Sequence, residues 1–195
     1  MLKTELRHRY LAERLKLSDD EVSQLSLQIF RNFLTTFSPD KSDIIHCFIP
    51  LTEKNEVNTQ PFFNYFFENK IAVVVPKIFD HKIIAVPITR ETVLVKQKWG
   101  ISEPESNEDF GADSLTHIIV PLLYADPKGN RVGYGKGFYD AFFAGANPEA
   151  LKIGVNFFPP VEEIDDMWEN DVPLDYLVTP TEVLSFGNGA SKLTK

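Results

Sequence analysis

Short runs of consecutive apolar residues recur along this chain, and stretches with helical periodicity separate most of them. The clearest runs are residues 44–49, 71–75 and 117–120, and further strands are expected at 83–86, 152–156 and 176–178. A strand that is apolar throughout, rather than at alternate positions, is buried on both faces. Because parallel strands need crossover helices between them, the pattern predicts an α/β fold: a mainly parallel sheet with helices on both faces.

Helical patterns fill much of the sequence between these strands. Residues 3–16 place apolar side chains at helical spacing, and Ser18 with Glu21 has the pattern of a capping box that starts a second helix. We expect two more helices at 59–69 and 136–145. Residues 92–95 are expected to pair with the strand at 83–86 as a hairpin, and residues 96–115 to form an irregular surface excursion.

Length and composition limit the classes of protein to consider. The 195 residues suit a single domain, which we place at residues 1–186, followed by a disordered tail at 187–195. The formal net charge of -8 argues against a nucleic-acid partner, since an acidic surface repels phosphate backbones. No apolar run reaches the roughly 18 residues of a membrane span, and the first residues lack the apolar core of a secretory signal, so no membrane partner is expected.

The single cysteine, Cys47, excludes an intrachain disulfide and suits a reducing compartment. Its apolar neighbours favour a buried structural thiol over a nucleophile. The four histidines show no metal-ligand spacing, and no G-x-S-x-G elbow is present. We therefore expect a cytoplasmic location and no serine or cysteine nucleophile. A monomer is the expected oligomeric state.

One stretch, DPKGNRVGYGKGFYD at 126–140, carries the most distinctive chemistry. It lies between the strand at 117–120 and the helix at 136–145, and ligands of an open parallel sheet bind beyond the carboxyl ends of the strands. Its alternating glycines at 133, 135 and 137 would let backbone amides approach a phosphate closely. Arg131 and Lys136 add positive charge, and Asp140 could reach a metal ion held on those phosphates.

This stretch fits neither of the common nucleotide fingerprints. A Walker A loop would need Gly at Asn130 and a hydroxyl at Gly137, and a Rossmann loop would need Gly at Phe138. On these residues alone, a glycine-rich turn with solvated charges is an equally good explanation.

The same stretch closely resembles the signature of the 5-formyltetrahydrofolate cyclo-ligases, also called methenyltetrahydrofolate synthetases. Shorter likenesses follow in the family's order and extend the resemblance from about Lys3 to Thr179: Lys3-x-x-Leu6-Arg7, Glu56-Val57-Asn58-Thr59, Gly100-Ile101-x-Glu103-Pro104, and Asp171 before Val172-Pro173-Leu174-Asp175. The chain departs from the family's pattern at Leu122, at Tyr124-Ala125 and at Ala141, and the departures at Leu122 and Ala141 bear on the packing around a nucleotide.

The resemblance implies an ATP-dependent cyclisation of 5-formyltetrahydrofolate to 5,10-methenyltetrahydrofolate, with release of ADP and phosphate through an N5-iminium phosphate. It implies Arg131 and Lys136 as catalytic residues that stabilise the transferring phosphoryl group, and Asp140 and Asp171 as ligands of Mg²⁺. The ATP contacts that it implies are Lys3, Arg7, Arg131, Gly133, Tyr134, Gly135, Lys136, Gly137, Phe138 and Tyr139. The implied folate contacts are Leu51, Glu56 and Tyr139.

Structural explanations for several of these residues stay open. Lys3 and Arg7 lie four residues apart on the first helix, so they could share a ligand or simply face solvent. Glu56 could be favoured by the dipole of the helix that follows it. Phe138 and Trp99 could pack in the core. For the whole protein, the alternatives are a different phosphoryl-transfer or phosphate-ester enzyme, and a folate- or nucleotide-binding module without turnover.

Overall fold

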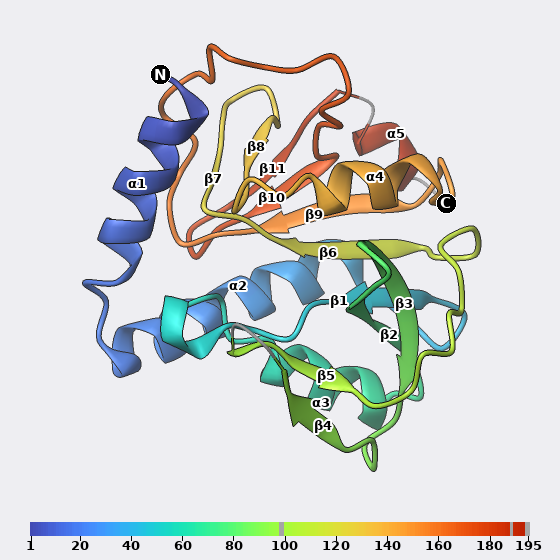
Figure 1. Ribbon diagram of the computed structural model, residues 1–195. Coiled ribbons are helices and arrows are strands. Elements are labelled where there is room, and N and C mark those ends of the chain that lie inside the picture. The colour runs from blue at the N-terminus through green and yellow to red at the C-terminus, as the bar shows by residue number, and fades with distance from the viewer. Residues whose placement is uncertain (98–99, 188, 194–195) are drawn as a thin grey trace.

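The computed structural model describes residues 1–97, 100–187 and 189–193. Seven strands form one sheet in the order β11-β10-β9-β6-β1-β2-β3 (Figure 1). The inner strands run parallel, whereas β3 and β11 pair antiparallel at the two edges. The predicted α/β fold with a mainly parallel sheet is thereby confirmed. The strands are β1 (Ile44–Cys47), β2 (Ala72–Phe79), β3 (Lys82–Ile88), β6 (His117–Pro121), β9 (Leu151–Val155), β10 (Tyr176–Val178) and β11 (Val183–Ser185).

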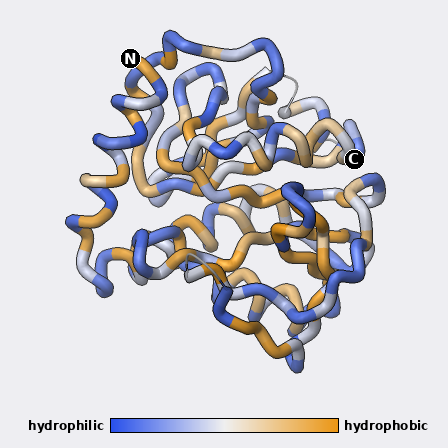
Figure 2. The backbone as a smooth tube through the Cα atoms, viewed as in Figure 1, coloured by the Kyte–Doolittle hydropathy of each residue, from blue (hydrophilic) through white to orange (hydrophobic). Residues whose placement is uncertain are grey.

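Side chains of the parallel strands alternate between two hydrophobic cores, one on each face of the sheet. Val73 and Val75 of β2 join the core under α2 (Asp19–Phe37) and α3 (Gln60–Glu68), whereas Val74 joins the other core. That second core contains two aromatic residues of α4 (Phe138–Ala144). Both faces are covered, so apolar residues suit every position of a strand. In Figure 2 the apolar segments accordingly follow the sheet, and hydrophilic segments surround it.

Helix α1 (Lys3–Arg14) packs against a small antiparallel hairpin formed by β7 (Tyr124–Ala125) and β8 (Arg131–Val132). Tyr10 of α1 stacks on Tyr124, with 4.2 Å between ring centroids. The buried Asp126 carboxylate holds the turn by accepting hydrogen bonds from the backbone N–H groups of Lys128 and Asn130, each at 2.9 Å. Strands of two residues have no periodic pattern, so the sequence analysis did not include this hairpin. It positions the glycine-rich stretch beside α1.

Strand pairing differs from the expectation at residues 92–95, which do not pair with β3. Strand β3 instead pairs with β2 across a two-residue turn at Asp80 and His81, whose φ angles are 47° and 62°. Turns with two positive φ angles match the twist of an antiparallel pair, so β2 is the natural partner. Strand β4 (Leu94–Lys96) pairs with β5 (Ser102–Pro104), so the expected irregular excursion over 96–115 is partly regular.

The excursion is tied to the sheet by Lys77 of β2. Its buried ammonium group donates to three consecutive backbone carbonyls, those of Pro104, Glu105 and Ser106, at 2.8 to 2.9 Å. Glu103 is also buried, and its carboxylate accepts from the backbone N–H of Ile78 at 3.0 Å. Polar contacts therefore order a segment whose composition is that of a loop.

Part of the predicted tail at 187–195 has regular secondary structure. Residues Gly189–Leu193 form the short helix α5, and Lys192 lies 3.1 Å from the Asp175 carboxylate. The domain at residues 1–186 and the disorder of the tail at 187–195 stay predictions. Among the helices of the described residues, none has the length and apolar character needed to cross a membrane.

Candidate active site

A cavity of about 750 Å³ opens at the carboxyl ends of β1 and β6, the edge at which open α/β sheets bind ligands. Segments far apart in the sequence form its wall: the start of α1, the residues after β1, strands β2 and β3, the stretch from β8 into α4, and residues 166–171. Every candidate contact from the sequence analysis lines it: Lys3, Arg7, Leu51, Glu56, Arg131, Gly133, Tyr134, Gly135, Lys136, Gly137, Phe138, Tyr139, Asp140 and Asp171. All of these candidate residues therefore lie at one cavity, and the role of each in binding or catalysis stays a prediction.

Residues 133–137, hereafter the glycine loop, run along one side of this cavity. Within the described chain, no acceptor is found for any backbone N–H group of this loop. Gly135 and Gly137 have φ angles of 82° and 68°, in the left-handed region that residues with a Cβ adopt at a cost. The loop thus presents a row of unpaired amide donors, which is a common way to bind an anion.

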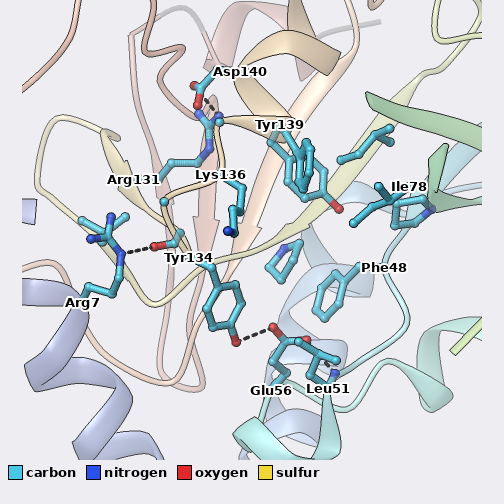
Figure 3. Close-up of a pocket in the computed structure, with 18 of the residues that line it drawn as sticks. Arg7, Phe48, Leu51, Glu56, Ile78, Arg131, Tyr134, Lys136, Tyr139 and Asp140 are labelled. Carbon is cyan, nitrogen blue, oxygen red and sulfur yellow. Dashed lines mark hydrogen bonds and ion pairs between the residues drawn. The ribbon is translucent and has the colours of Figure 1, made fainter. Parts of the chain in front are cut away.

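Two cations with spare donors lie at the glycine loop: Lys136 is part of it, and Arg7 lies beside it. The Nε of Arg7 donates to the Gly133 carbonyl at 2.9 Å, and no described group accepts from its two terminal nitrogens. The Lys136 ammonium has no hydrogen bond or ion pair with any described residue, and Figure 3 shows its side chain directed into the cavity. These groups can bind negative charge without first breaking a protein contact.

Arg131 is more constrained than the sequence analysis assumes. Its guanidinium forms an ion pair with Asp140 at 2.6 Å, donates to the Val172 carbonyl, and lies 4.7 Å from the ring centroid of Phe143. Burial lowers the pKa of Arg131, and the nearby Asp140 opposes that shift. Both terminal nitrogens of the guanidinium donate to protein groups, so Arg131 first of all fixes the wall of the cavity.

The two candidate metal ligands, Asp140 and Asp171, both lie at the cavity and both face cations. Asp140 pairs with Arg131, and Asp171 pairs with Lys3 and accepts from the Trp168 backbone N–H at 2.6 Å. No group of three or more acidic, histidine or cysteine side chains within the described residues is placed to hold a metal ion. Mg²⁺, however, binds through one or two carboxylates together with substrate phosphates. The donor set therefore fits an ion that enters with a nucleotide.

Glu56 is buried at the opposite side of the cavity. Its Oε1 accepts from the Tyr134 hydroxyl at 2.8 Å, and its Oε2 accepts from the Leu51 backbone N–H at 2.7 Å (Figure 3). Burial raises the pKa of Glu56, and the two hydrogen bonds oppose that shift. Because its oxygens face the cavity and the glycine loop, the dipole of α3, which starts at Gln60, is not needed to explain this residue.

Arg14 is a part of this arrangement that the sequence analysis did not identify. Arg14 is 2% exposed, and its guanidinium donates to the Tyr134 hydroxyl at 2.6 Å. A signal was present in the sequence, since Leu6, Tyr10 and Arg14 are spaced by four residues and all three are buried. An arginine that continues a buried apolar stripe needs acceptors inside the protein.

The aromatic candidates differ in their surroundings. Tyr139 packs against Phe142, Phe143 and His46, and its buried hydroxyl has no hydrogen-bond partner among the described residues. Burial raises the pKa of this hydroxyl well above its usual value. Phe138 is partly exposed at the cavity. Trp99 lies outside the described residues. Apolar side chains that the sequence analysis did not list complete the cavity around Tyr139: Phe48, Ile49, Ile78, Ile83 and Ile101.

Comparisons with known proteins agree with one another. Residues 1–180 match the 5-formyltetrahydrofolate cyclo-ligase family. A 5-formyltetrahydrofolate cyclo-ligase of Mycoplasma pneumoniae is 28% identical, over 91% of this chain and 98% of its own. A probable 5-formyltetrahydrofolate cyclo-ligase of Schizosaccharomyces pombe is 30% identical, over 87% of this chain and 90% of its own.

Solved structures extend this agreement to the fold. The NMR structure of the 5,10-methenyltetrahydrofolate synthetase of Aquifex aeolicus gives a TM-score of 0.79 at 30% identity, covering 95% of this chain and 93% of that one. The structure of a 5,10-methenyltetrahydrofolate synthetase of Mycoplasma pneumoniae gives a TM-score of 0.73 at 28% identity, covering 92% of this chain and 99% of that one. The chain therefore belongs to the 5-formyltetrahydrofolate cyclo-ligase family of enzymes.

Proposed function

We propose that this enzyme uses MgATP to convert 5-formyltetrahydrofolate into 5,10-methenyltetrahydrofolate, ADP and phosphate. The formyl oxygen attacks the γ-phosphorus of ATP, the bond to the bridging oxygen breaks, and ADP leaves. The resulting N5-iminium phosphate carries an activated formyl carbon. N10 attacks that carbon and loses its proton, the C–O bond breaks, and phosphate departs with the former formyl oxygen.

The glycine loop, which includes Lys136, and the neighbouring Arg7 carry this proposal. Phosphoryl transfer requires little covalent help from a protein, but it requires alignment and stabilisation of negative charge. The unpaired amides of residues 133–137, the free ammonium of Lys136 and the spare donors of Arg7 face one cavity. This is a suitable set of donors for the β- and γ-phosphates of ATP, and Lys136 is the group best placed to stabilise the transferring phosphoryl group.

The remainder of the cavity suits a reduced folate. Its apolar wall, which includes Phe48 and Ile78, could cover the flat pterin and benzoyl rings, with Tyr139 against them. The Glu56 carboxylate could accept hydrogen bonds from the N–H groups at the edge of the pterin. The backbone N–H of Leu51 holds that carboxylate in place by a hydrogen bond to its Oε2. Asp140 and Asp171 would hold Mg²⁺, which when bound offsets the negative charge of the phosphates.

Turnover tests the proposal directly. Folded protein mixed with MgATP and 5-formyltetrahydrofolate should produce the absorbance of the methenyl product, with one ADP released per product. Omission of ATP, or chelation of Mg²⁺, should abolish the signal. Calorimetry that detects folate binding by folded protein without turnover would instead favour the binding-module alternative. A monomeric state and a cytoplasmic location stay predictions, which light scattering and cell fractionation would address.

A further inference from the structure

Arg14 directs three of its donors to three separate segments that border the cavity. Its Nε donates to the Lys54 carbonyl at 2.7 Å, its Nη1 donates to the Leu122 carbonyl at 3.1 Å, and its Nη2 donates to the Tyr134 hydroxyl at 2.6 Å. The Arg14 side chain belongs to α1 and Tyr134 belongs to the glycine loop. Lys54 is the last residue of η1 (Thr52–Lys54), and Leu122 directly follows β6. A buried arginine therefore joins the parts of the wall.

Tyr134 passes this connection on to Glu56. Its hydroxyl accepts from Arg14 and donates to Glu56 Oε1, so the three groups form one hydrogen-bonded chain. Within the described residues, the glycine loop has few other anchors: the Arg7 contact to the Gly133 carbonyl and the first turn of α4. The position of the loop thus depends in large part on a single tyrosine oxygen.

The same hydrogen bonds also affect the ionisation of the Glu56 carboxyl. The charged and titratable side chains of the described residues that face this carboxylate are Arg14, Tyr134 and Tyr139. Burial raises the pKa of Glu56, whereas the Tyr134 hydroxyl and the positive charge of Arg14 lower it. Loss of either group removes part of the stabilisation of the ionised form.

We propose that Arg14 is a positioning residue for the reaction. It holds the Tyr134 hydroxyl against Glu56 and thereby fixes the position of the glycine loop relative to the Glu56 carboxylate. Arg14 itself does not line the cavity, and it acts through Tyr134. This inference rests on the proposed function, because it takes Glu56 as the contact to the folate and the glycine loop as the contact to ATP. It assigns a role to a residue that neither substrate touches.

The test compares Tyr134→Phe, Arg14→Met and the double variant with wild type. Tyr134→Phe removes one oxygen from a side chain that is 36% exposed, so the fold should survive even if Arg14→Met fails to fold. We expect kcat/KM for 5-formyltetrahydrofolate to fall about tenfold or more in Tyr134→Phe, the factor that the loss of a hydrogen bond to a charged group gives. The acid limb of its pH profile should move to higher pH. The double variant should be about as impaired as the worse single variant, because both changes break one chain.

Arg9→Met is the matched control, since Arg9 lies on the same helix in an ion pair with Glu162, and its side chain is 51% exposed. It should keep the wild-type profile. Wild-type kcat/KM and an unmoved acid limb in Tyr134→Phe would overturn the inference, as would single-variant effects that multiply in the double variant.

A titration of the Glu56 carboxyl by ¹³C NMR in ligand-free protein separates this inference from the proposed function. Its pKa should be higher in Tyr134→Phe than in wild type or Arg9→Met, and an equal pKa would overturn the inference. An inactive wild type would refute the proposed function alone, because the titration still reports whether the chain of hydrogen bonds holds Glu56.

Discussion

The glycine loop allows a graded test, because its three glycines differ in backbone conformation and in surroundings. A Cβ at Gly133 would meet no atom within 4 Å, and this residue is not in the left-handed region. A Cβ at Gly137 also has open space, but φ is 68°. A Cβ at Gly135 has φ of 82° and would lie 3.2 Å from Nη2 and 3.3 Å from Cζ of Arg7. Alanine therefore adds no cost at position 133 and a conformational cost at position 137. At position 135 it adds both a conformational and a steric cost.

The magnitudes follow from these differences. A left-handed residue with a Cβ costs about 1–2 kcal/mol, whereas Gly→Ala at a compatible site stabilises by about 0.4–1 kcal/mol through the unfolded chain. Gly133→Ala should therefore raise the free energy of unfolding by about 0.4–1 kcal/mol, whereas Gly137→Ala should lower it by about 1 kcal/mol. Gly135→Ala should lower it by about 2 kcal/mol, because the Arg7 guanidinium must also move.

Equilibrium unfolding in urea measures all three variants on one scale, and the KM for ATP provides a second scale. Displacement of Arg7 from the glycine loop should raise the KM for ATP more in Gly135→Ala than in Gly137→Ala. If Gly135→Ala proved as stable as Gly133→Ala, the left-handed conformation and the close approach of Arg7 would both be refuted as the reason for glycine at this position.

Three further outcomes are expected. Lys136→Ala should lower kcat about a hundredfold or more without a change in melting temperature, because the exposed ammonium has no described protein partner; parallel losses of activity and melting temperature would contradict this. Asp126→Ala should lower the free energy of unfolding in urea by about 3 kcal/mol, because the N–H donors of the β7–β8 turn lose their acceptor; a change below about 1 kcal/mol would count against it. Burial lowers the pKa of His46 to about 4, so the folded state favours the neutral ring. In the unfolded chain the ring takes up a proton near pH 6.5, and the free energy of unfolding therefore decreases as pH falls from about 6.5 toward 4. His46→Leu should remove up to about 3 kcal/mol of that loss, and equal acid sensitivity of variant and wild type in urea unfolding would refute it.

The sequence by itself determined the class of fold and predicted the nature of the site. Continuous apolar runs such as 71–75 and 117–120 can be satisfied only where both faces of a strand are covered, so they require a parallel sheet between helices. The glycine-rich stretch indicated an anion site because alternating glycines and cations are a local pattern that is visible in fifteen consecutive residues. Helix limits were predictable for the same reason, since capping and periodicity act over a few neighbouring positions.

Only the tertiary structure decided which distant residues meet. Glu56 and Tyr134 are 78 positions apart, and Lys3 and Asp171 are 168 apart, yet each pair is in contact. The spacing of Arg14 after Leu6 and Tyr10 indicates a buried side chain, but only folding shows that Tyr134 is its partner. The partner of β4 was not evident from residues 92–95 either: β3 pairs with β2 across the turn at Asp80–His81, and β4 pairs with β5. Propensity and periodicity describe the neighbours of a residue along the chain, whereas charge pairing and strand pairing depend on which segments the packed core brings together.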